Sequence, residues 1–389
     1  MKMKYIYLLL ILTFSINALR AQPVDSPPGV VINHIPANLD RFIGSPSICI
    51  LPDGNYIVSH DEFGPTSTEF KSAITRIYVS VDKGKSWKRI SQIDGQFWSS
   101  LFYLNGALYI IGTNKHHGNL VLRRSDDYGK TWTIPYDGKN GLLLEGEYHT
   151  APTPVLFHKG RIWRAVEYAT AQTTKWGERY SAMVVSAPLN SDLMNAGNWT
   201  RTNHLYYNPD YLNGSFQAWL EGNVVVTPSG EVVDVLRVQV PKGHKEVMAL
   251  VKVGLSGDSV SFNASDFYDM PGAAKKFTIR YDTVTQRYWS LVNEVPDSLQ
   301  KMPPNSVRNM ITLVSSLDLK KWKRHKAVLF HPDHLRHGFQ YVDWLFEKND
   351  IIFVSRTAYD DNTGGAKNNH DANFITFHRI ENFRMLNID

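Results

Sequence analysis

Charged, histidine and aromatic residues recur where apolar stretches of this chain begin and end. These residue types can carry chemistry. Imidazole, phenol and carboxylate groups move protons, and a guanidinium binds an anion through parallel hydrogen bonds. The candidates at such places are His60, Asp61, His149, Arg164, Tyr168, Glu221, Arg237, Tyr341 and Arg356. What they can do together depends on whether the fold brings them to one place.

The elements that must position these residues are pairs of apolar strands. Each pair is rich in β-branched and aromatic side chains and turns at Gly, Asp or Asn, which is typical of a β-hairpin. Six hairpins span residues 45–61, 97–114, 149–168, 219–238, 276–294 and 340–359. Further β-rich sequence follows each hairpin, and no stretch shows a convincing long helical period.

The regular return of the hairpin, at roughly fifty- to seventy-residue spacing, predicts four-stranded blades around an axis. We therefore expect an all-β fold, a six-bladed β-propeller, with seven blades as the alternative. Residues 30–35 would add the outermost strand to the last blade and close the ring. No linker or composition shift divides the chain, so we expect residues 22–389 to form a single propeller domain.

The geometry of a propeller predicts where the candidates meet. Inner strands converge on the axis, and the start of a blade's first strand lies at the same rim as the end of its second strand. Residues at hairpin starts and ends should therefore line one central pocket. Asn114, His116 and His117 would join it from the second hairpin.

Two segments share the turn pattern Ser-x-Asp-x-Gly-x-x-Trp, at residues 80–87 and 125–132, and residues 316–322 hold a shorter copy without the glycine. In such a turn the Ser and Asp side chains bond backbone groups, and Gly adopts a conformation that other residues resist. The Trp packs between blades. The pattern is the structural Asp-box, or BNR repeat, and the chain resembles the sialidase superfamily over nearly its whole mature length.

That resemblance implies a catalytic set. Tyr341 matches the tyrosine that acts as nucleophile, and Glu221 matches the glutamate that assists it. Arg237 and Arg308 resemble two of the arginines that bind the substrate's carboxylate, and Asp61 stands where the acid/base aspartate is expected. The resemblance thus implies an exo-acting glycoside hydrolase that cleaves terminal linkages of acidic, sialic- or uronic-acid-containing glycans.

The arginine content supports an acidic substrate. If Arg164, Arg237, Arg308 and Arg356 share one pocket, their charges repel one another strongly where the dielectric is low. A carboxylate on the substrate would offset this repulsion. Glu167, Glu221 and Asp343 offer the alternative, which is pairing within the protein.

A second interpretation starts from a difference between this sequence and the sialidase pattern. Where sialidases open the first blade with Arg-Ile-Pro, residues 42–46 read Phe-Ile-Gly-Ser-Pro, and Arg41 is out of register. His60, His149, Arg164 and Tyr168 would then form a uronate site in which His moves a proton, Tyr is its partner and Arg neutralises the carboxylate. This set is similar to propeller enzymes that cleave rhamnose from glucuronic acid and to propeller polysaccharide lyases.

A third interpretation is a glycan-binding propeller without catalysis, because proteins that share a fold do not always share an activity. Aromatic faces in the pocket would serve a binding module as well as an enzyme. Ionisable residues that converge at one rim favour the enzyme.

Composition and the N-terminal residues narrow the possible binding partners and the cellular location. The chain has 389 residues and a formal net charge of +5, without a Lys/Arg run typical of nucleic-acid binding. Lys2 and Lys4 precede an apolar stretch at residues 5–16, and small residues offer a cleavage site after Ala21. We therefore expect residues 1–21 to be a signal peptide and the mature protein to be secreted or periplasmic, with no membrane association after cleavage.

The sequence indicates neither disulfides nor a cofactor. Cys49 is the single cysteine, so an internal disulfide is excluded. The histidines at residues 115–118, 331–334 and 369–371 lack the ligand spacing of a closed zinc site, so we expect no metal. The expected partner is an oligosaccharide or polysaccharide with an acidic sugar, bound by a monomer.

Overall fold

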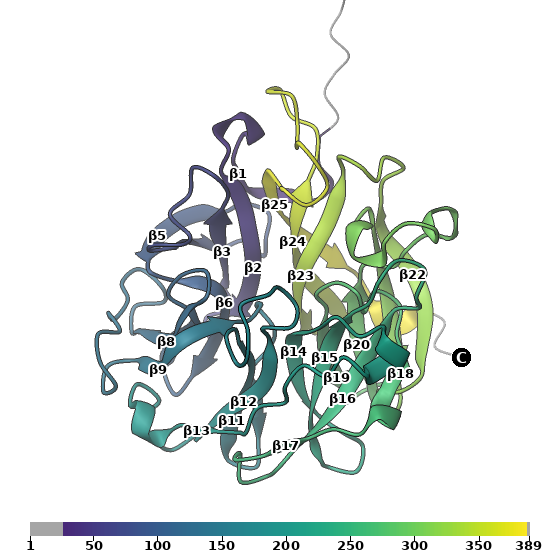
Figure 1. The fold of residues 1–389 in the computed structure, drawn as a ribbon. Helices are drawn as coiled ribbons and strands as arrows, with labels where there is room; N and C mark the ends of the chain where they lie inside the picture. Colours follow the sequence, from purple (N-terminus) through teal and green to yellow (C-terminus); the bar gives the residue numbers. More distant parts are fainter. Residues whose placement is uncertain (1–25, 387–389) are drawn as a thin grey trace, which may run out of the picture.

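The computed structural model describes residues 26–386, which form antiparallel β-sheets that follow one another around the molecule (Figure 1). The predicted signal peptide lies outside the described residues. Helical structure within 26–386 is confined to single 3₁₀ turns, at Ala37–Leu39, Ala196–Asn198, Tyr211–Gly214, Ala264–Asp266, Asp297–Leu299, Pro304–Ser306 and Phe383–Met385. In this part of the chain no helix is long and apolar enough to cross a bilayer.

The strands run through the sheets in sequence order. The first sheet contains β2 (Phe42–Ile50), β3 (Tyr56–Phe63), β4 (Ile74–Ser80) and β5 (Lys88–Asp94). An eight-stranded sheet follows, with β6 (Phe97–Leu104), β7 (Ala107–Thr113), β8 (Gly118–Ser125), β9 (Leu142–His149), β10 (Leu156–His158), β11 (Arg161–Tyr168), β12 (Ser181–Pro188) and β13 (Thr200–Arg201). Next come β14 (Ala218–Val226), β15 (Val232–Gln239), β16 (Val247–Val253), β17 (Val260–Ser261) and β18 (Phe267–Asp269). The last two sheets hold β19 (Thr278–Asp282), β20 (Arg287–Val292), β21 (Met310–Ser316) and β22 (Trp322–Phe330), then β23 (Gly338–Glu347), β24 (Asp350–Ala358), β25 (Phe374–Ile380) and β1 (Val30–His34).

The predicted hairpins are present. Antiparallel pairs form between β2 and β3, β6 and β7, β14 and β15, β19 and β20, and β23 and β24. The third hairpin is shorter than predicted, because its first strand is only β10 and His149 instead ends β9. Pro152 and Pro154 explain the difference, since proline cannot donate to a strand ladder.

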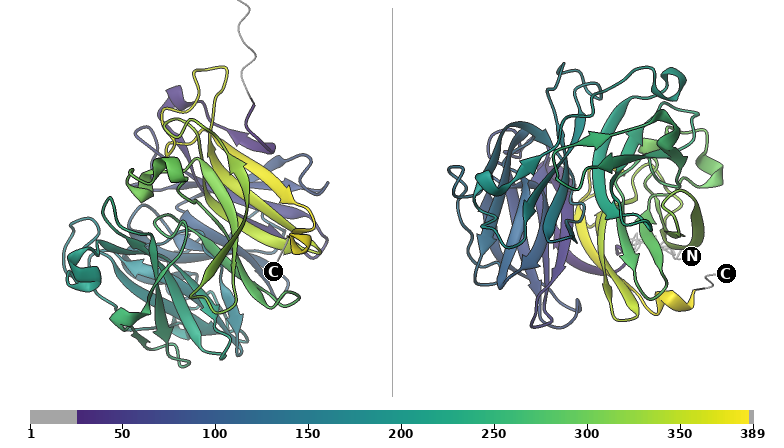
Figure 2. Two further views of the ribbon diagram at one scale, coloured as in Figure 1. Left: turned by 90° about the vertical axis from the view of Figure 1, so that its right-hand side faces the viewer. Right: turned by 90° about the horizontal axis from the view of Figure 1, so that it is seen from below.

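The ring closes as the sequence predicts. β1, from the start of the described chain, pairs antiparallel with β25 from its end. Figure 2 shows the same closure, with the yellow strands beside the purple ones. The first strands meet near the axis, where β2 packs against both β6 and β23, and β14 against both β11 and β19.

Apolar clusters lie between successive sheets, so both faces of a middle strand are buried. Every residue of β15 is buried, for example, although its sequence includes Asp234 and Arg237. Between the first and last sheets, Ile48, Val58, Ile352 and Ile375 pack together with residues of β1. The hydrophobic effect therefore acts between blades, and each blade depends on its neighbours.

The turns at residues 80–87 and 125–132 follow β4 and β8, the third strands of their units. Ser80 Oγ donates to Asp82 Oδ1 at 2.8 Å and accepts from the Gly84 N–H, and the Ser86 N–H donates to Asp82. Gly84 has a φ of 87°, and a β-carbon there would collide with the Phe377 ring. Trp87 packs on that ring, in the cluster between the first and last sheets.

Truncation of Ile375 on β25 is expected to destabilise the ring closure. Ile375 is fully buried, so Ile375→Ala removes buried apolar side-chain atoms and leaves a cavity. The free energy of unfolding should fall by about 2–5 kcal/mol. Val31→Ala on the paired strand β1 is the control, because Val31 is 42 % exposed. Urea unfolding measures both, and similar midpoints for the two variants would contradict the packing.

Candidate functional site

The inner strands bend at equivalent places. β6, β14 and β23 each carry a β-bulge, and the first bulged residues, Trp98, Glu221 and Tyr341, have φ values of 47°, 53° and 52°. Non-glycine residues resist this left-handed conformation, and such strain is concentrated at functional sites. In β2 the bulge falls at Gly44, where a β-carbon would lie 1.6 Å from Asp61 Oδ1. The repeated bulge turns one side chain per strand out of the ladder.

These side chains line one cavity of about 370 Å³ near the axis. It takes residues from β2 and β3, β6, the loop between β7 and β8, β9, β14 and β15, β23 and β24. The polar and aromatic residues around it include Asp61, Phe63, Glu69, Trp98, His116, His117, His149, Trp176, Tyr180, Glu221, Arg237, Arg308, Tyr341, Arg356 and His370. Nine of the residues predicted for the pocket are therefore brought together: Asp61, His116, His117, His149, Glu221, Arg237, Arg308, Tyr341 and Arg356.

Tyr341 and Glu221 form a hydrogen-bonded pair. The Tyr341 hydroxyl donates to Glu221 Oε1 at 3.1 Å, and Arg237 Nη1 donates to Glu221 Oε2 at 2.7 Å. Burial raises the pKa of Glu221, but Arg237, His149 and the two hydrogen bonds together leave that pKa below its usual value. Burial and the Glu221 charge raise the pKa of Tyr341. The pair is thus a neutral phenol held against an ionised carboxylate that can take its proton.

Three guanidinium groups surround the phenol. The Arg356 guanidinium lies 5.0 Å from the centroid of the Tyr341 ring and donates to the His370 carbonyl. Arg237 is paired with Glu221. Arg308 has no ion-pair or side-chain hydrogen-bond partner within residues 26–386, and its Nη1 atom is buried. Burial lowers the pKa of Arg308 to about 10, and its two neighbouring arginines act in the same direction.

Asp61 lies elsewhere on the cavity wall, against the bulges of β2 and β6. Its Oδ1 accepts from the Ser45 N–H at 2.5 Å and its Oδ2 from the Trp98 N–H at 2.7 Å. Burial raises the pKa of Asp61 to about 7, although these two hydrogen bonds and Arg356 oppose the shift. A carboxyl group with such a pKa can both donate and accept a proton near neutrality.

A wall of aromatic and imidazole rings completes the cavity. The Trp98 ring centroid lies 4.5 Å from that of His149 and 4.7 Å from that of His116. His149 Nδ1 lies 2.8 Å from Glu167 Oε2, and the other Glu167 oxygen accepts from the Gly222 N–H. Glu167 is fully buried, so it holds both His149 and the bulge next to Glu221.

Four residues predicted for the pocket do not line the cavity: His60, Asn114, Arg164 and Tyr168. The Asn114 side chain accepts from the Asn119 N–H within its own loop. His60 neighbours Asp61 on β3, and alternation along the strand turns it away from the axis, where it bonds Asn33 and stacks on Tyr78. Tyr168 follows Glu167 and is turned away for the same reason, so that its ring contacts those of Tyr148 and His204.

Arg164 is fully buried beneath the cavity. Its guanidinium donates to the carbonyls of Ala151 and Thr153 and to the Thr150 hydroxyl. These groups belong to the proline-containing segment that forms no strand ladder. The arginine therefore adds hydrogen bonds to carbonyls that also accept from the Thr153 N–H and the Ser100 hydroxyl, and it ties the segment to β11. The predicted uronate set of His60, His149, Arg164 and Tyr168 is therefore not assembled, and only His149 remains in the cavity.

Trp98 and Tyr180 are cavity residues that were not predicted from the sequence, and His370 was considered there only as a metal ligand. A signal existed for Trp98. When the hairpins are aligned on their bulges, Trp98 stands where Glu221 and Tyr341 stand in theirs. Tyr180 and His370 come from irregular segments, which carry no periodic signal.

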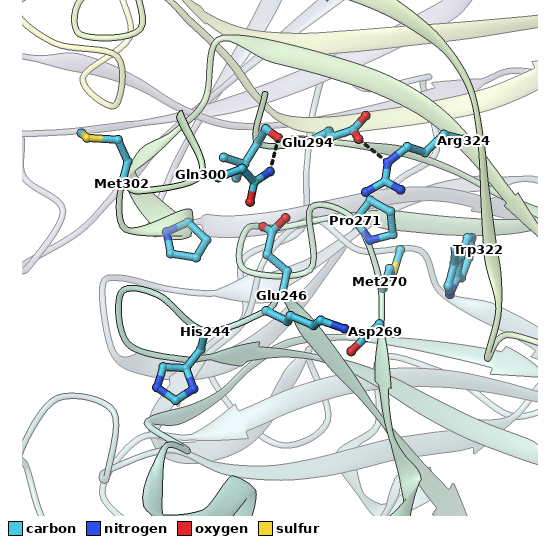
Figure 3. A pocket seen from close by; sticks show the side chains of 13 residues that line it. His244, Glu246, Asp269, Met270, Pro271, Glu294, Gln300, Met302, Trp322 and Arg324 are labelled. Atoms are coloured by element: carbon cyan, nitrogen blue, oxygen red, sulfur yellow. Dashed lines mark hydrogen bonds and ion pairs between the residues drawn. The ribbon is translucent and has the colours of Figure 1, made fainter. Parts of the chain in front are cut away.

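A second cavity, of about 340 Å³, lies away from the central one, among residues of β18, β22 and the loops after β15, β18 and β20 (Figure 3). Its charged side chains pair with one another: Glu294 bonds Arg324, Glu246 bonds Lys275 at 2.7 Å, and Lys245 bonds Asp269 at 3.1 Å. Because these charges are neutralised within the protein, the central cavity is the stronger candidate site. Within residues 26–386, no cluster of three or more His, Cys, Asp or Glu side chains is arranged to hold a metal ion.

A scan of protein-family profiles finds no match to this chain, and a search of curated proteins finds no relative. Solved structures do match. The α-L-arabinanase of Penicillium chrysogenum, complexed with arabinobiose, aligns with a TM-score of 0.58 at 14 % identity, over 92 % of this chain and 98 % of that one. A Hadza microbial sialidase aligns with a TM-score of 0.60 at 12 % identity, over 92 % of this chain and 69 % of the other.

The sialidase of Trypanosoma rangeli, in complex with sialic acid, aligns with a TM-score of 0.53 at 13 % identity, over 86 % of this chain and 54 % of the other. These similarities extend over most of the described chain and concern the arrangement of strands. Together with the ring of sheets and its closure by β1, they show that the chain is a β-propeller of the sialidase type.

Proposed function

We propose that this protein is a sialidase-like glycoside hydrolase that removes an acidic sugar from the non-reducing end of a glycan. Two of the structural neighbours are complexes with a sugar, one with arabinobiose and one with sialic acid, which supports a carbohydrate ligand. The preference for an acidic sugar rests on this chain's own residues.

The observation that carries the proposal is the unpaired Arg308. A buried guanidinium without an ion-pair partner is costly, and two further arginines increase the cost, which the nearby Glu221 charge offsets only in part. None of the three expected internal partners is an ion-pair partner of Arg308. Glu221 pairs with Arg237 and Glu167 with His149, and Asp343 lies 3.4 Å from Arg280. A substrate carboxylate supplies the missing charge and meets the planar donor group of arginine in its preferred geometry.

The proposed reaction proceeds in two steps. Tyr341 attacks the anomeric carbon while its phenolic proton passes to Glu221, and Asp61 gives its proton to the glycosidic oxygen as that bond breaks. The neutral phenol suits an anionic sugar, because an anionic nucleophile would be repelled by the carboxylate. Water then attacks the same carbon and gives a proton to Asp61, and the released Tyr341 recovers its proton from Glu221.

The test compares an acidic glycoside with its analogue in which the carboxylate is reduced to an alcohol. Wild-type kcat/KM is expected to favour the acid about ten- to a hundredfold, because a charge-assisted hydrogen-bond pair contributes about 1.5–3 kcal/mol. Arg308→Met should remove most of this preference by lowering activity on the acid alone. Initial rates on sialic-acid and glucuronic-acid glycosides, each with its reduced partner, measure the effect.

Arg324→Met is the matched control, because Arg324 is paired with Glu294 in the second cavity. This variant should keep the wild-type preference. Equal rates on acidic and reduced substrates would refute the acidic specificity and leave a neutral-sugar glycosidase on the same scaffold.

The histidine-centred alternative keeps one supporting observation, the His149–Glu167 pair. In this alternative His149 would take a proton from a uronate, or would act in cleavage of a rhamnose–glucuronate linkage. We favour the hydrolase because the Tyr341–Glu221–Arg237 chain is continuous, whereas His60, Arg164 and Tyr168 lie outside the cavity.

We also propose that the ring has six blades. The eight-stranded sheet would count as two blades, because β9 and β11 pair only at Glu167–His149 and Tyr168–Tyr148. Export through a cleaved signal peptide fits a glycan substrate outside the cell.

A further inference from the structure

The central cavity has two chemically different sides. One side carries Glu221, Tyr341 and the three arginines, from β14, β23, β15, β24 and the segment before β21. The other side is made by Trp98, His116, His117, His149 and Tyr180, from β6, the β7–β8 loop, β9 and the segment before β12. Among the residues that line the cavity, no lysine or arginine belongs to this second side.

The second side, which we call the indole–imidazole wall (Trp98, His116, His117, His149 and Tyr180), is fixed by its own contacts. His117 Nε2 lies 3.0 Å from the Tyr180 hydroxyl, and His149 Nδ1 is held by Glu167. The rings of His116, His117 and His149 all lie within 6 Å of the Trp98 ring centroid. Burial lowers the pKa of His116 to about 4 and also lowers the pKa of His117, so both are neutral at physiological pH.

Asp61 stands at the border between the two sides. It is held by the backbone N–H of Trp98, and its strand belongs to the sheet whose inner strand, β2, packs against β6 on one side and β23 on the other. In the proposed reaction Asp61 protonates the glycosidic oxygen, which is the atom that joins the two sugars. One sugar then lies beside Tyr341 and the other beside Trp98.

We infer that the indole–imidazole wall is the binding site for the leaving group, and that it selects an uncharged sugar whose apolar face stacks on Trp98. This inference rests on the proposed function. The rigid indole offers a flat apolar surface, and the neutral imidazoles offer hydrogen bonds to hydroxyl groups. A second carboxylate would find no unpaired cation here, because His149 is paired with Glu167 and the neighbouring Arg179 with Glu147. It would also approach Glu69, which lines the same side. The substrate is thus a linkage between an acidic terminal sugar and a neutral one.

The test varies only the leaving group. The substrates are the methyl glycosides and the galactosides of N-acetylneuraminic acid and of glucuronic acid. Trp98→Ala should lower kcat/KM at least about tenfold more on a galactoside than on the methyl glycoside of the same acid, because only the galactoside reaches the wall. Trp98→Phe, which keeps a flat ring, should recover much of the difference.

The Trp98 backbone N–H bonds Asp61, so a change at Trp98 could also alter the general acid. His117→Ala tests the wall without this effect, because His117 makes no hydrogen bond to Asp61. It should show the same selective loss on galactosides. Tyr136→Ala is the control: Tyr136 is exposed and does not line the cavity, so both substrates should react as with the wild type.

The outcomes separate the two proposals. Equal losses on methyl glycoside and galactoside, for both Trp98→Ala and His117→Ala, would overturn the leaving-group site and leave the acidic specificity intact. Loss of the acid preference in the wild type would overturn the proposed function instead. Where turnover is too slow to measure, dissociation constants from calorimetry give the same comparison, with the same expected ratio.

Discussion

Tyr341→Phe is expected to lower kcat about 10³- to 10⁵-fold while KM changes only a few-fold, the range seen when a nucleophile is removed from an enzyme. The variant deletes one oxygen, which lies 3.1 Å from Glu221 Oε1 and faces the cavity. The ring, which stacks near the Arg356 guanidinium, stays in place, so substrate binding should be largely preserved. Steady-state rates on an acidic aryl glycoside measure the effect, and Glu221→Gln should reduce kcat by orders of magnitude as well.

Tyr288→Phe is the matched control. Tyr288 is buried outside the cavity, where its hydroxyl donates to the Val226 carbonyl at 2.6 Å. Loss of that hydrogen bond should cost stability of about 1 kcal/mol and leave kcat unchanged. If Tyr341→Phe kept more than a tenth of wild-type kcat while His149→Ala lost most of it, the nucleophile assignment would be wrong and histidine-centred chemistry would take its place.

The fold could be predicted from the sequence because the patterns that indicate its strands and turns are local. Each hairpin shows period-two alternation, and the turns at residues 80–87 and 125–132 are built from side chains within a few residues of one another. The β1–β25 pairing is long-range, but it follows from the need of the last blade for a fourth strand. Local chemistry and ring topology thus predict which strands exist and how they pair.

The candidate site was only partly accessible, because its geometry depends on bulges. One extra residue in a strand reverses which side chains face the axis. Alternation along β3 turns Asp61, and not His60, toward the cavity, and the bulge in β2 places the Ser45 N–H against the Asp61 carboxylate. The hairpin pattern alone could not distinguish these neighbours.

Arg164 and Trp98 show a different limit. Arg164 was expected to bind substrate, but it serves carbonyls of an irregular proline-containing segment that only tertiary structure brings beneath it. Trp98 reads as a core residue in an apolar strand, and only its left-handed φ exposes it to the cavity. A buried charge and an apolar ring are thus ambiguous until their hydrogen-bond partners and backbone conformation are known.

The pH dependence of wild-type activity should depend on Asp61. As the general acid it must be protonated to act, and its pKa is raised to about 7 by burial. The active form therefore predominates below pH 7 and is lost as the pH rises through that value, so kcat/KM should fall tenfold per unit on the basic side. The measurement is a pH profile between about 5 and 9 with a disaccharide substrate, whose leaving sugar needs the proton.

Asp61→Asn should abolish this basic limb and lower kcat/KM on the disaccharide about 10²- to 10⁴-fold. A 4-methylumbelliferyl glycoside of the same acid should lose far less, because its leaving group departs without a proton. Asp234→Asn is the control, since Asp234 is also a buried carboxyl with a raised pKa but does not line the cavity, and it should keep the limb. A limb that persists in Asp61→Asn would assign the acid to another group, for which His149, held by Glu167 beside Trp98, is the nearest candidate on the same side of the cavity.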